Sequence, residues 1–232
     1  MEKQDKVTHM HVVDLAPLTD DATSVYSFLQ RTTQLWSKID DEMEPEETLW
    51  IFVPNIYQEG VCWSVPMAVA DHARTNTGLI LKNIVTCHQE FSSDGDMDNS
   101  YEEILFFIKD KRAYQFNKDA IRVAHVYKGN EWGGEREKGN SAYHDTEVRR
   151  YNPEGKDPGN VWLNELRDQT SGETVDETKP LSRTEALRRC LRAGSEEDKV
   201  VNLWAANDEF HETVTSENRE IRHHSIAQVI DK

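Results

Sequence analysis

The sequence predicts an α/β protein built around a largely parallel sheet, and two observations carry this prediction. LWIFVPN, residues 49–55, is a nearly continuous apolar run, which is typical of a strand buried on both faces of a parallel sheet. Strand-like and helical segments also alternate between residues 7 and 88, as they do in α/β folds. At 232 residues the chain is long enough for one sizeable core, so we expect a single domain over residues 1–232.

The first half of the chain supplies this alternation. VTHMHVVDL, residues 7–15, has strand character and ends in a short apolar run. Thr19 or Asp20 can cap a helix over residues 21–39, where apolar residues recur at helical spacing. After the 49–55 strand, we expect a helix over residues 61–74 and a strand over residues 79–88.

The second half is regular only at its two ends. YEEILFFIKDKRAYQF predicts two strands around a turn at residues 110–112. Residues 117–178 show no clear period, and an irregular segment of that length inside a domain is usually functional or held by a partner. The remaining expected elements are a helix from its Ser182 cap to Ala193, a strand over 199–204, a short strand over 213–216 and a helix over 219–230.

The charge of the chain argues against general binding to nucleic acid. There are 43 acidic and 27 basic residues, so the net charge is −16 and a phosphate backbone is repelled. Residues 109–156 are the exception, with eleven Lys and Arg against eight Asp and Glu. If the chain contacts DNA, we expect the contact there. A mixed-charge surface would give the same count, and the overall acidity also fits a salt-rich cytoplasm or a basic partner protein.

Metal, disulfide and membrane functions have little support. The three cysteines are distant in sequence, and the carboxylates at 94, 96 and 98 lack the glycine and the final glutamate of a calcium loop. The histidine pairs at 9 and 11 and at 223 and 224 have no suitably spaced third ligand. We expect no metal site, no membrane span, no signal peptide and a cytoplasmic location.

Cations and aromatic residues are interspersed in the irregular region. Cations bind phosphates and aromatic rings stack on bases, so these residues are candidates for DNA contact. Scattered surface charge with a few buried rings would produce the same pattern. The candidates are Lys128, Trp132, Arg136, Lys138, Arg149 and Arg150.

Four stretches, in order, together resemble the β-class amino-group DNA methyltransferases, which methylate adenine or cytosine with S-adenosylmethionine. They are LWIFVPN; NIVTCHQEF with YEEILFFIKDKRAYQFN; RYNPEGKDPGNVW; and TKPLSRTEALRRCLRAGSEEDKVV. The resemblance implies a Rossmann-like methyltransferase fold with the circularly permuted motif order of that class. It also implies that residues 117–178 are an inserted target-recognition or partner-contact region.

The cofactor turn departs from the family pattern. In the family, the strand after the KP helix ends in D-P-F-x-G-S-G-T, whose glycines let the backbone approach the methionine end of the cofactor. Both glycines are missing here, and an acidic residue stands where the family leaves space. The matching positions are Asn202, Leu203, Trp204, Ala205, Ala206, Asn207 and Asp208.

The catalytic turn departs as well. The family reads D-P-P-Y after its strand, where the polar residue and a prolyl carbonyl hold the target amino group and the ring stacks on the flipped base. Here the chain reads Asp14, Leu15, Ala16 and Pro17, so the acid is retained without the proline pair or the aromatic ring.

The loss of both turns predicts a non-catalytic subunit with no bound cofactor. Because members of the family commonly pair through their methyltransferase domains, we expect a heterodimer with a catalytic homologue that binds S-adenosylmethionine. The complex would bind double-stranded DNA and associate with the nucleoid. Two alternatives remain: an active DNA methyltransferase with atypical motifs, and a regulatory scaffold without DNA contact.

Overall fold

The computed structural model describes residues 8–19, 22–88, 101–123, 131–132, 149–150, 152, 154–163, 180–205 and 207–230. Its helices are α1 (Val25–Glu42), α2 (Val65–Asn76), α3 (Arg183–Gly194), α4 (Asp208–Ser216) and α5 (Ala227–Ile230). Its main strands are β1 (Thr8–Asp14), β2 (Thr48–Val53), β5 (Ile80–His88), β6 (Tyr101–Ile108), β9 (Val161–Trp162), β10 (Val200–Trp204) and β11 (Glu220–His223).

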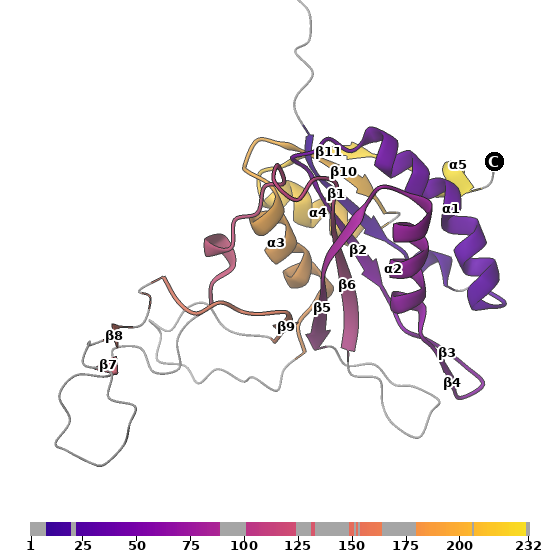
Figure 1. Ribbon diagram of the computed structural model, residues 1–232, viewed down its shortest axis with the longest axis horizontal. Helices are drawn as coiled ribbons and strands as arrows, with labels where there is room; N and C mark the ends of the chain where they lie inside the picture. Colours follow the sequence, from indigo (N-terminus) through magenta and orange to yellow (C-terminus); the bar gives the residue numbers. More distant parts are fainter. Residues whose placement is uncertain are drawn as a thin grey trace, which may run out of the picture.

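These strands form one seven-stranded sheet in the order β11-β10-β1-β2-β6-β5-β9. The first four strands are parallel to one another, β6 is antiparallel to both of its neighbours, and β9 is parallel to β5. Helices α1, α2 and α5 cover one face, and α3 and α4 cover the other (Figure 1). The expected α/β sheet is therefore confirmed, with one antiparallel strand in its interior.

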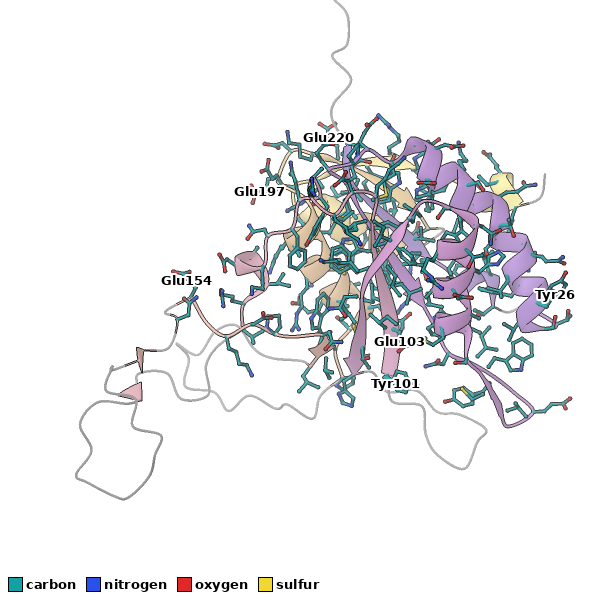
Figure 2. All side chains as sticks on the ribbon, in the orientation of Figure 1. Tyr26, Tyr101, Glu103, Glu154, Glu197 and Glu220 are labelled. Carbon is teal, nitrogen blue, oxygen red and sulfur yellow. The ribbon has the colours of Figure 1, made fainter. Side chains whose placement is uncertain are left out.

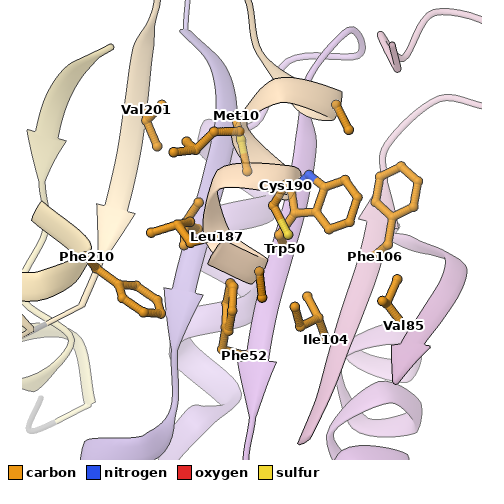
Figure 3. Close-up of a cluster of buried hydrophobic side chains, with 14 of the residues drawn as sticks. Met10, Trp50, Phe52, Val85, Ile104, Phe106, Leu187, Cys190, Val201 and Phe210 are labelled. Atoms are coloured by element: carbon orange, nitrogen blue, oxygen red, sulfur yellow. The ribbon is translucent and has the colours of Figure 1, made fainter. Parts of the chain in front are cut away.

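The apolar side chains of β2 pack on both faces of the sheet. Trp50 and Phe52 pack in the cluster beneath α3 and α4, which Figure 3 shows, while Leu49, Ile51 and Val53 pack in the cluster beneath α1 and α2. Successive side chains of a strand point to opposite faces, so a central strand covered on both faces is mostly apolar along its whole length. All six residues of β2 are buried, as the sequence predicts.

Two elements of the first half differ from expectation. A short 3-10 turn, Ala16–Leu18, follows β1 and is closed by Thr19, so α1 begins only at Val25, where Ser24 is its cap. The expected helix over 61–74 is divided in two. Its start belongs to a hairpin of β3 (Ile56–Gln58) and β4 (Val61–Trp63), and α2 begins at Val65.

The segment after β6 is not a strand. The backbone N–H of Gln115 donates to the carbonyl of Glu46, and that of Asn117 donates to the carbonyl of Ala193. These bonds run to a loop and to a helix end, so no sheet partner is available. The expected two-stranded unit around residues 110–112 therefore consists of β6 alone.

The last two elements are also the reverse of the prediction. Residues 213–216 lie in α4, which begins after the cap Asn207, and residues 220–223 form β11 rather than helix. Only the short α5 is helical within the expected 219–230 helix. The reason is topological, because β11 lies parallel to β10 and a parallel neighbour needs a crossover helix between the two strands.

Candidate functional site

The two sequence-predicted turns meet at one place, the carboxyl end of the strands between β10 and β1. From β10 the chain passes through α4 to β11, and from β1 it passes through α1 to β2 on the other side. In open α/β sheets ligands bind at the carboxyl ends of two neighbouring strands from which the chain continues to opposite sides of the sheet. This point of the sheet is therefore the candidate functional site.

Asp14 is the last residue of β1, and only 1% of it is exposed. Its Oδ1 accepts hydrogen bonds from Arg183 Nη2 at 2.7 Å and from the Ala16 backbone at 3.0 Å. Its Oδ2 accepts from Arg183 Nη1 at 3.3 Å. Both carboxylate oxygens are thus engaged by groups of the protein itself.

Arg183 opens α3 next to the cap Ser182, whose side chain accepts from the Glu185 N–H as the sequence predicts. Its Nε lies 3.0 Å from Glu102 Oε2, so it bridges two buried carboxylates. The guanidinium carbon also lies 5.7 Å from the centre of the Phe52 ring and 5.2 Å from that of Phe210. Cation–π contact of this kind adds to the ion pairs.

The protonation of Arg183 is fixed by these neighbours. Burial lowers the pKa of the guanidinium, but the charges of Glu102 and Asp14 and their hydrogen bonds outweigh burial and raise the pKa above its usual value. The site therefore contains a permanent cation held between two acids. Sequence reasoning missed Arg183, because it lies 169 positions from Asp14 and no local pattern connects the two.

Trp204 ends β10 and is completely buried. Its indole Nε1 donates to His11 Nδ1 at 3.3 Å, and its ring stacks on His224 with centroids 4.0 Å apart. The other ring nitrogen of His11, Nε2, lies 3.1 Å from Glu47 Oε2. The indole thus belongs to the buried cluster beneath α1 and α2.

His224 completes a polar network around this indole. Its Nε2 lies 2.8 Å from Asn202 Oδ1, and its backbone N–H donates to the Leu203 carbonyl. Burial lowers the pKa of His224 to about 4. The sequence leaves these histidines as unassigned strand or surface residues. In the structure His11 and His224 both contact Trp204. No group of side chains that could hold a metal ion occurs among the described residues.

The turn after β10 leads directly into α4. Ala205 is buried, and the Asn207 side chain accepts from the Glu209 N–H at 2.8 Å. Asp208, the first residue of α4, is exposed, and Ala206 lies outside the described residues. The start of α4 is thus capped by its own side chain and carries two acids, which oppose an anionic ligand at that helix end.

The candidate DNA-contact residues are only partly described. Trp132 pairs with Arg149, and Glu131 with Arg150, in the backbone register of the two-stranded sheet formed by β7 (Glu131–Trp132) and β8 (Arg149–Arg150). The remaining candidates, Lys128, Arg136 and Lys138, lie outside the described residues, as do the carboxylates at 94, 96 and 98.

One cation of the positive stretch has a structural role. Lys109 Nζ donates to the carbonyls of Asp40 and Met43 at the end of α1. A lysine at the last turn of a helix satisfies carbonyls that have no partner within the helix. Lys109 is therefore not available for phosphate contact in this structure.

No helix in the described ranges has the length and apolar character that crossing a membrane requires.

Comparison with known proteins agrees with this architecture. The family model described as "DNA methylase" matches residues 17–202. No curated protein matches the chain. Among solved structures, the cytosine-N4-specific PvuII DNA methyltransferase has a TM-score of 0.62 at 9% identity, with 97% of this chain and 78% of that chain covered.

Two further solved structures are similar. TTHA0409 of Thermus thermophilus, assigned as a DNA modification methylase, has a TM-score of 0.56 at 13% identity, over 93% of this chain and 79% of that chain. The M1.HpyAVI complex with SAM has a TM-score of 0.51 at 12% identity, over 98% and 89%. At these identities the structures show that the fold is that of S-adenosylmethionine-dependent methyltransferases, as the sequence resemblance implies.

Proposed function

Since this chain belongs to the DNA methylase family, we propose that it is a non-catalytic subunit that pairs with an active DNA methyltransferase and contributes to DNA binding in DNA modification. The observation that carries the proposal is the engagement of Asp14 at the carboxyl end of β1. Asp14 is buried, and both of its carboxylate oxygens accept hydrogen bonds from Arg183.

Methyl transfer needs a bound cofactor and a target amino group within about 3–3.5 Å of each other in the reacting geometry. The turn that follows Trp204 leads directly into α4, whose first turn carries two acids. The Asp14 carboxylate, which would have to accept from the target amino group, already accepts from a guanidinium that is charged at every physiological pH. These contacts support the loss of both cofactor binding and catalysis.

The intact sheet supports the view that the chain has kept its fold because its surface contacts a partner. Each face of the seven-stranded sheet is covered by a large cluster of buried apolar side chains. A folded scaffold without its own cofactor fits a subunit that assembles with a catalytic homologue, which would bind S-adenosylmethionine. A stable interface of this kind buries more than about 1,000 Å². The proposed complex would associate with the nucleoid in the cytoplasm.

The proposal is tested by calorimetry of the purified chain with S-adenosylmethionine, followed by co-expression with an intact family member from the same genome. We expect no measurable cofactor binding by the chain alone, and a heterodimer in size-exclusion chromatography. Micromolar cofactor binding with DNA methylation by the isolated chain would establish the alternative, an active enzyme with atypical motifs. A heterodimer whose DNA affinity and methylation are unchanged by the chain would establish the other, a scaffold without DNA contact.

A further inference from the structure

A hollow of about 840 Å³ opens at the amino end of the strands, opposite the candidate functional site. It is lined by residues 115–117 and Ala120, by the end of α3 with residues 195–197, and by residues 216–219 between α4 and β11. Glu197 marks this end of the molecule in Figure 2, far from Glu103 at the opposite edge of the sheet. The candidate functional site at the carboxyl end of the sheet and this hollow are thus separate features.

Two helices end at this hollow. α3 ends at Gly194 and α4 ends at Ser216, and both of these residues line it. Carbonyl groups at a helix C-terminus carry a partial negative charge and favour a cation nearby. The two helix ends therefore give the hollow a negative field before any side chain is considered.

The two arginines of the lining are occupied within the protein. Arg192 forms two hydrogen bonds of 2.7 Å with the Glu217 carboxylate. Arg219, which is largely buried, donates to the side chain and carbonyl of Ser195 and to the Glu217 carbonyl. Burial lowers the pKa of Arg219, and the charges of Glu217 and Glu197 oppose that shift. Arg192 is thus paired with Glu217, whereas the hydrogen bonds of Arg219 run to neutral groups and its charge acts on Glu197 as well as on Glu217.

Two exposed carboxylates of the lining remain. Glu196 and Glu197 follow α3 directly, and neither forms a salt bridge within the part of the chain that the structure describes. Together with the helix ends they leave the hollow with an excess of negative charge. A phosphate group is repelled by this lining, so the hollow does not suit DNA.

The lining also includes an aromatic ring. Phe116 lines the hollow and is 38% exposed. Its inner face continues a stack from the core, with ring centroids 5.5 Å from Phe106 and 6.4 Å from Trp50. The stack holds the ring in a fixed orientation, and an exposed aromatic face attracts a planar cation.

We propose that this hollow binds an arginine side chain presented by a basic segment of another protein. A guanidinium can stack on Phe116 while its N–H groups donate to Glu196 or Glu197, a combination that a lysine ammonium cannot match. The net charge of −16 adds long-range attraction for a basic partner. The proposal does not depend on whether the chain is catalytic or on which protein it pairs with.

The test uses the full chain and a short capped peptide with one arginine between two glycines, followed by amide shifts of Asn117, Gly194 and Ser195 in NMR spectra. We expect saturable shifts at these three amides and weaker binding of the peptide with lysine in place of arginine. The double variant Glu196→Gln/Glu197→Gln should weaken arginine binding by at least tenfold. Phe116→Leu should remove the preference for arginine over lysine.

The matched control is Glu209→Gln/Glu212→Gln, which removes two exposed acids of α4 that do not line the hollow. This variant should bind the arginine peptide as the parent does, with the same dependence on salt. Shifts that do not saturate, equal binding of the lysine peptide, or equal weakening in the control and the double variant would each overturn the proposal. A variant that loses the parental NMR spectrum is replaced by the single substitution Glu197→Gln, for which at least threefold weakening is expected.

Discussion

Arg183 Nη2 lies 2.7 Å from Asp14 Oδ1, at the carboxyl end of β1. From β1 and its neighbour β10, the chain continues to opposite sides of the sheet. Asp14 is the acid that the catalytic turn retains, and the arginine converts it into a structural partner. With Glu102 on its other side, Arg183 joins the end of β1 and the start of α3 to the start of β6. The same contact that stabilises the carboxyl end of the sheet also occupies both oxygens of Asp14.

Replacing Arg183 should destabilise the fold strongly. Arg183→Ala leaves two buried carboxylates without their cation, and breaking a buried pair in this way costs about 3 kcal/mol or more. Denaturant unfolding measures this loss. The control Arg188→Ala removes a more exposed arginine of the same helix and should cost about 0–1 kcal/mol. Equal unfolding midpoints for the two variants would show that Arg183 is not a structural centre of the site.

Replacing Trp204 should cost stability without creating a cofactor site. Trp204→Ala leaves a cavity beneath His224 and should lower the free energy of unfolding by about 3–5 kcal/mol. Trp204→Phe keeps an aromatic ring and loses only the hydrogen bond to His11, so about 1 kcal/mol is expected. Unfolding curves compare the two. We expect no binding of S-adenosylmethionine by either variant, since the turn still lacks its glycines, and binding by Trp204→Ala would contradict this.

The network around His224 should make the fold sensitive to acid. Burial holds the pKa of His224 at about 4, below its ordinary value of 6.5. As pH falls from about 6.5 to 4, the unfolded chain binds this proton and the folded chain does not, so stability falls across that window. Glu42 opposes the lowered pKa, whereas His11, Lys38 and Arg222 reinforce it.

The measurement is thermal unfolding between pH 4 and pH 7. His224→Phe keeps the stack on Trp204 and removes the titrating group, so the stability of this variant should fall less with acid than that of the parent. His211→Phe, at an exposed position of α4, should leave the acid dependence unchanged. Parallel pH curves for the parent and His224→Phe would exclude His224 as the source of the sensitivity.

Two glycines of the GKDPGNVW segment should differ in their tolerance of a side chain. Gly155 has a φ of 107°, and an added Cβ would lie 2.3 Å from the Val123 carbonyl oxygen, whereas Gly159 has a φ of 69° and open space around it. Gly159→Ala should cost only the backbone strain, about 1–2 kcal/mol. Gly155→Ala must also displace the backbone of the Val123–Lys156 bridge. A larger loss of stability for Gly155→Ala is expected in denaturant unfolding, and a smaller one would contradict the geometry.

Replacing the cations of the irregular region should weaken DNA binding by the proposed complex. We would change Lys128, Arg136, Lys138, Arg149 and Arg150 to alanine together. The salt dependence of binding should fall by roughly one unit of slope for every phosphate that is no longer bound. A control with Lys38, Arg74 and Arg188 replaced removes exposed cations from α1, α2 and α3.

Fluorescence anisotropy across a salt titration measures the affinity, and a methylation assay measures the activity. We expect lower affinity and activity for the fivefold variant, with unchanged cofactor affinity of the partner and normal assembly. Parental methylation by a normally assembled fivefold variant would assign the DNA contacts to the catalytic partner alone.

The regular elements could be predicted where local pattern decides them. Five of the six residues of β2 are apolar because both faces of a central strand are covered, and Ser182 marks the start of α3 because a short polar side chain caps the first turn. The segment from 208 to 223 could not be predicted in the same way. Thr213 to Ser216 has no strong preference for strand or helix, and the requirement for a crossover before β11 decided its state.

The sequence by itself determined the family, the order of its motifs and the loss of the glycines and of the proline pair, because these are properties of neighbouring residues. Only the tertiary structure decided which contacts the residues around these two turns make. Arg183 reaches Asp14 across 169 positions, and His11, Trp204 and His224 come together from three separate parts of the chain. A contact between distant residues leaves no periodic signal in a single sequence, since it depends on how the strands and helices are arranged in space.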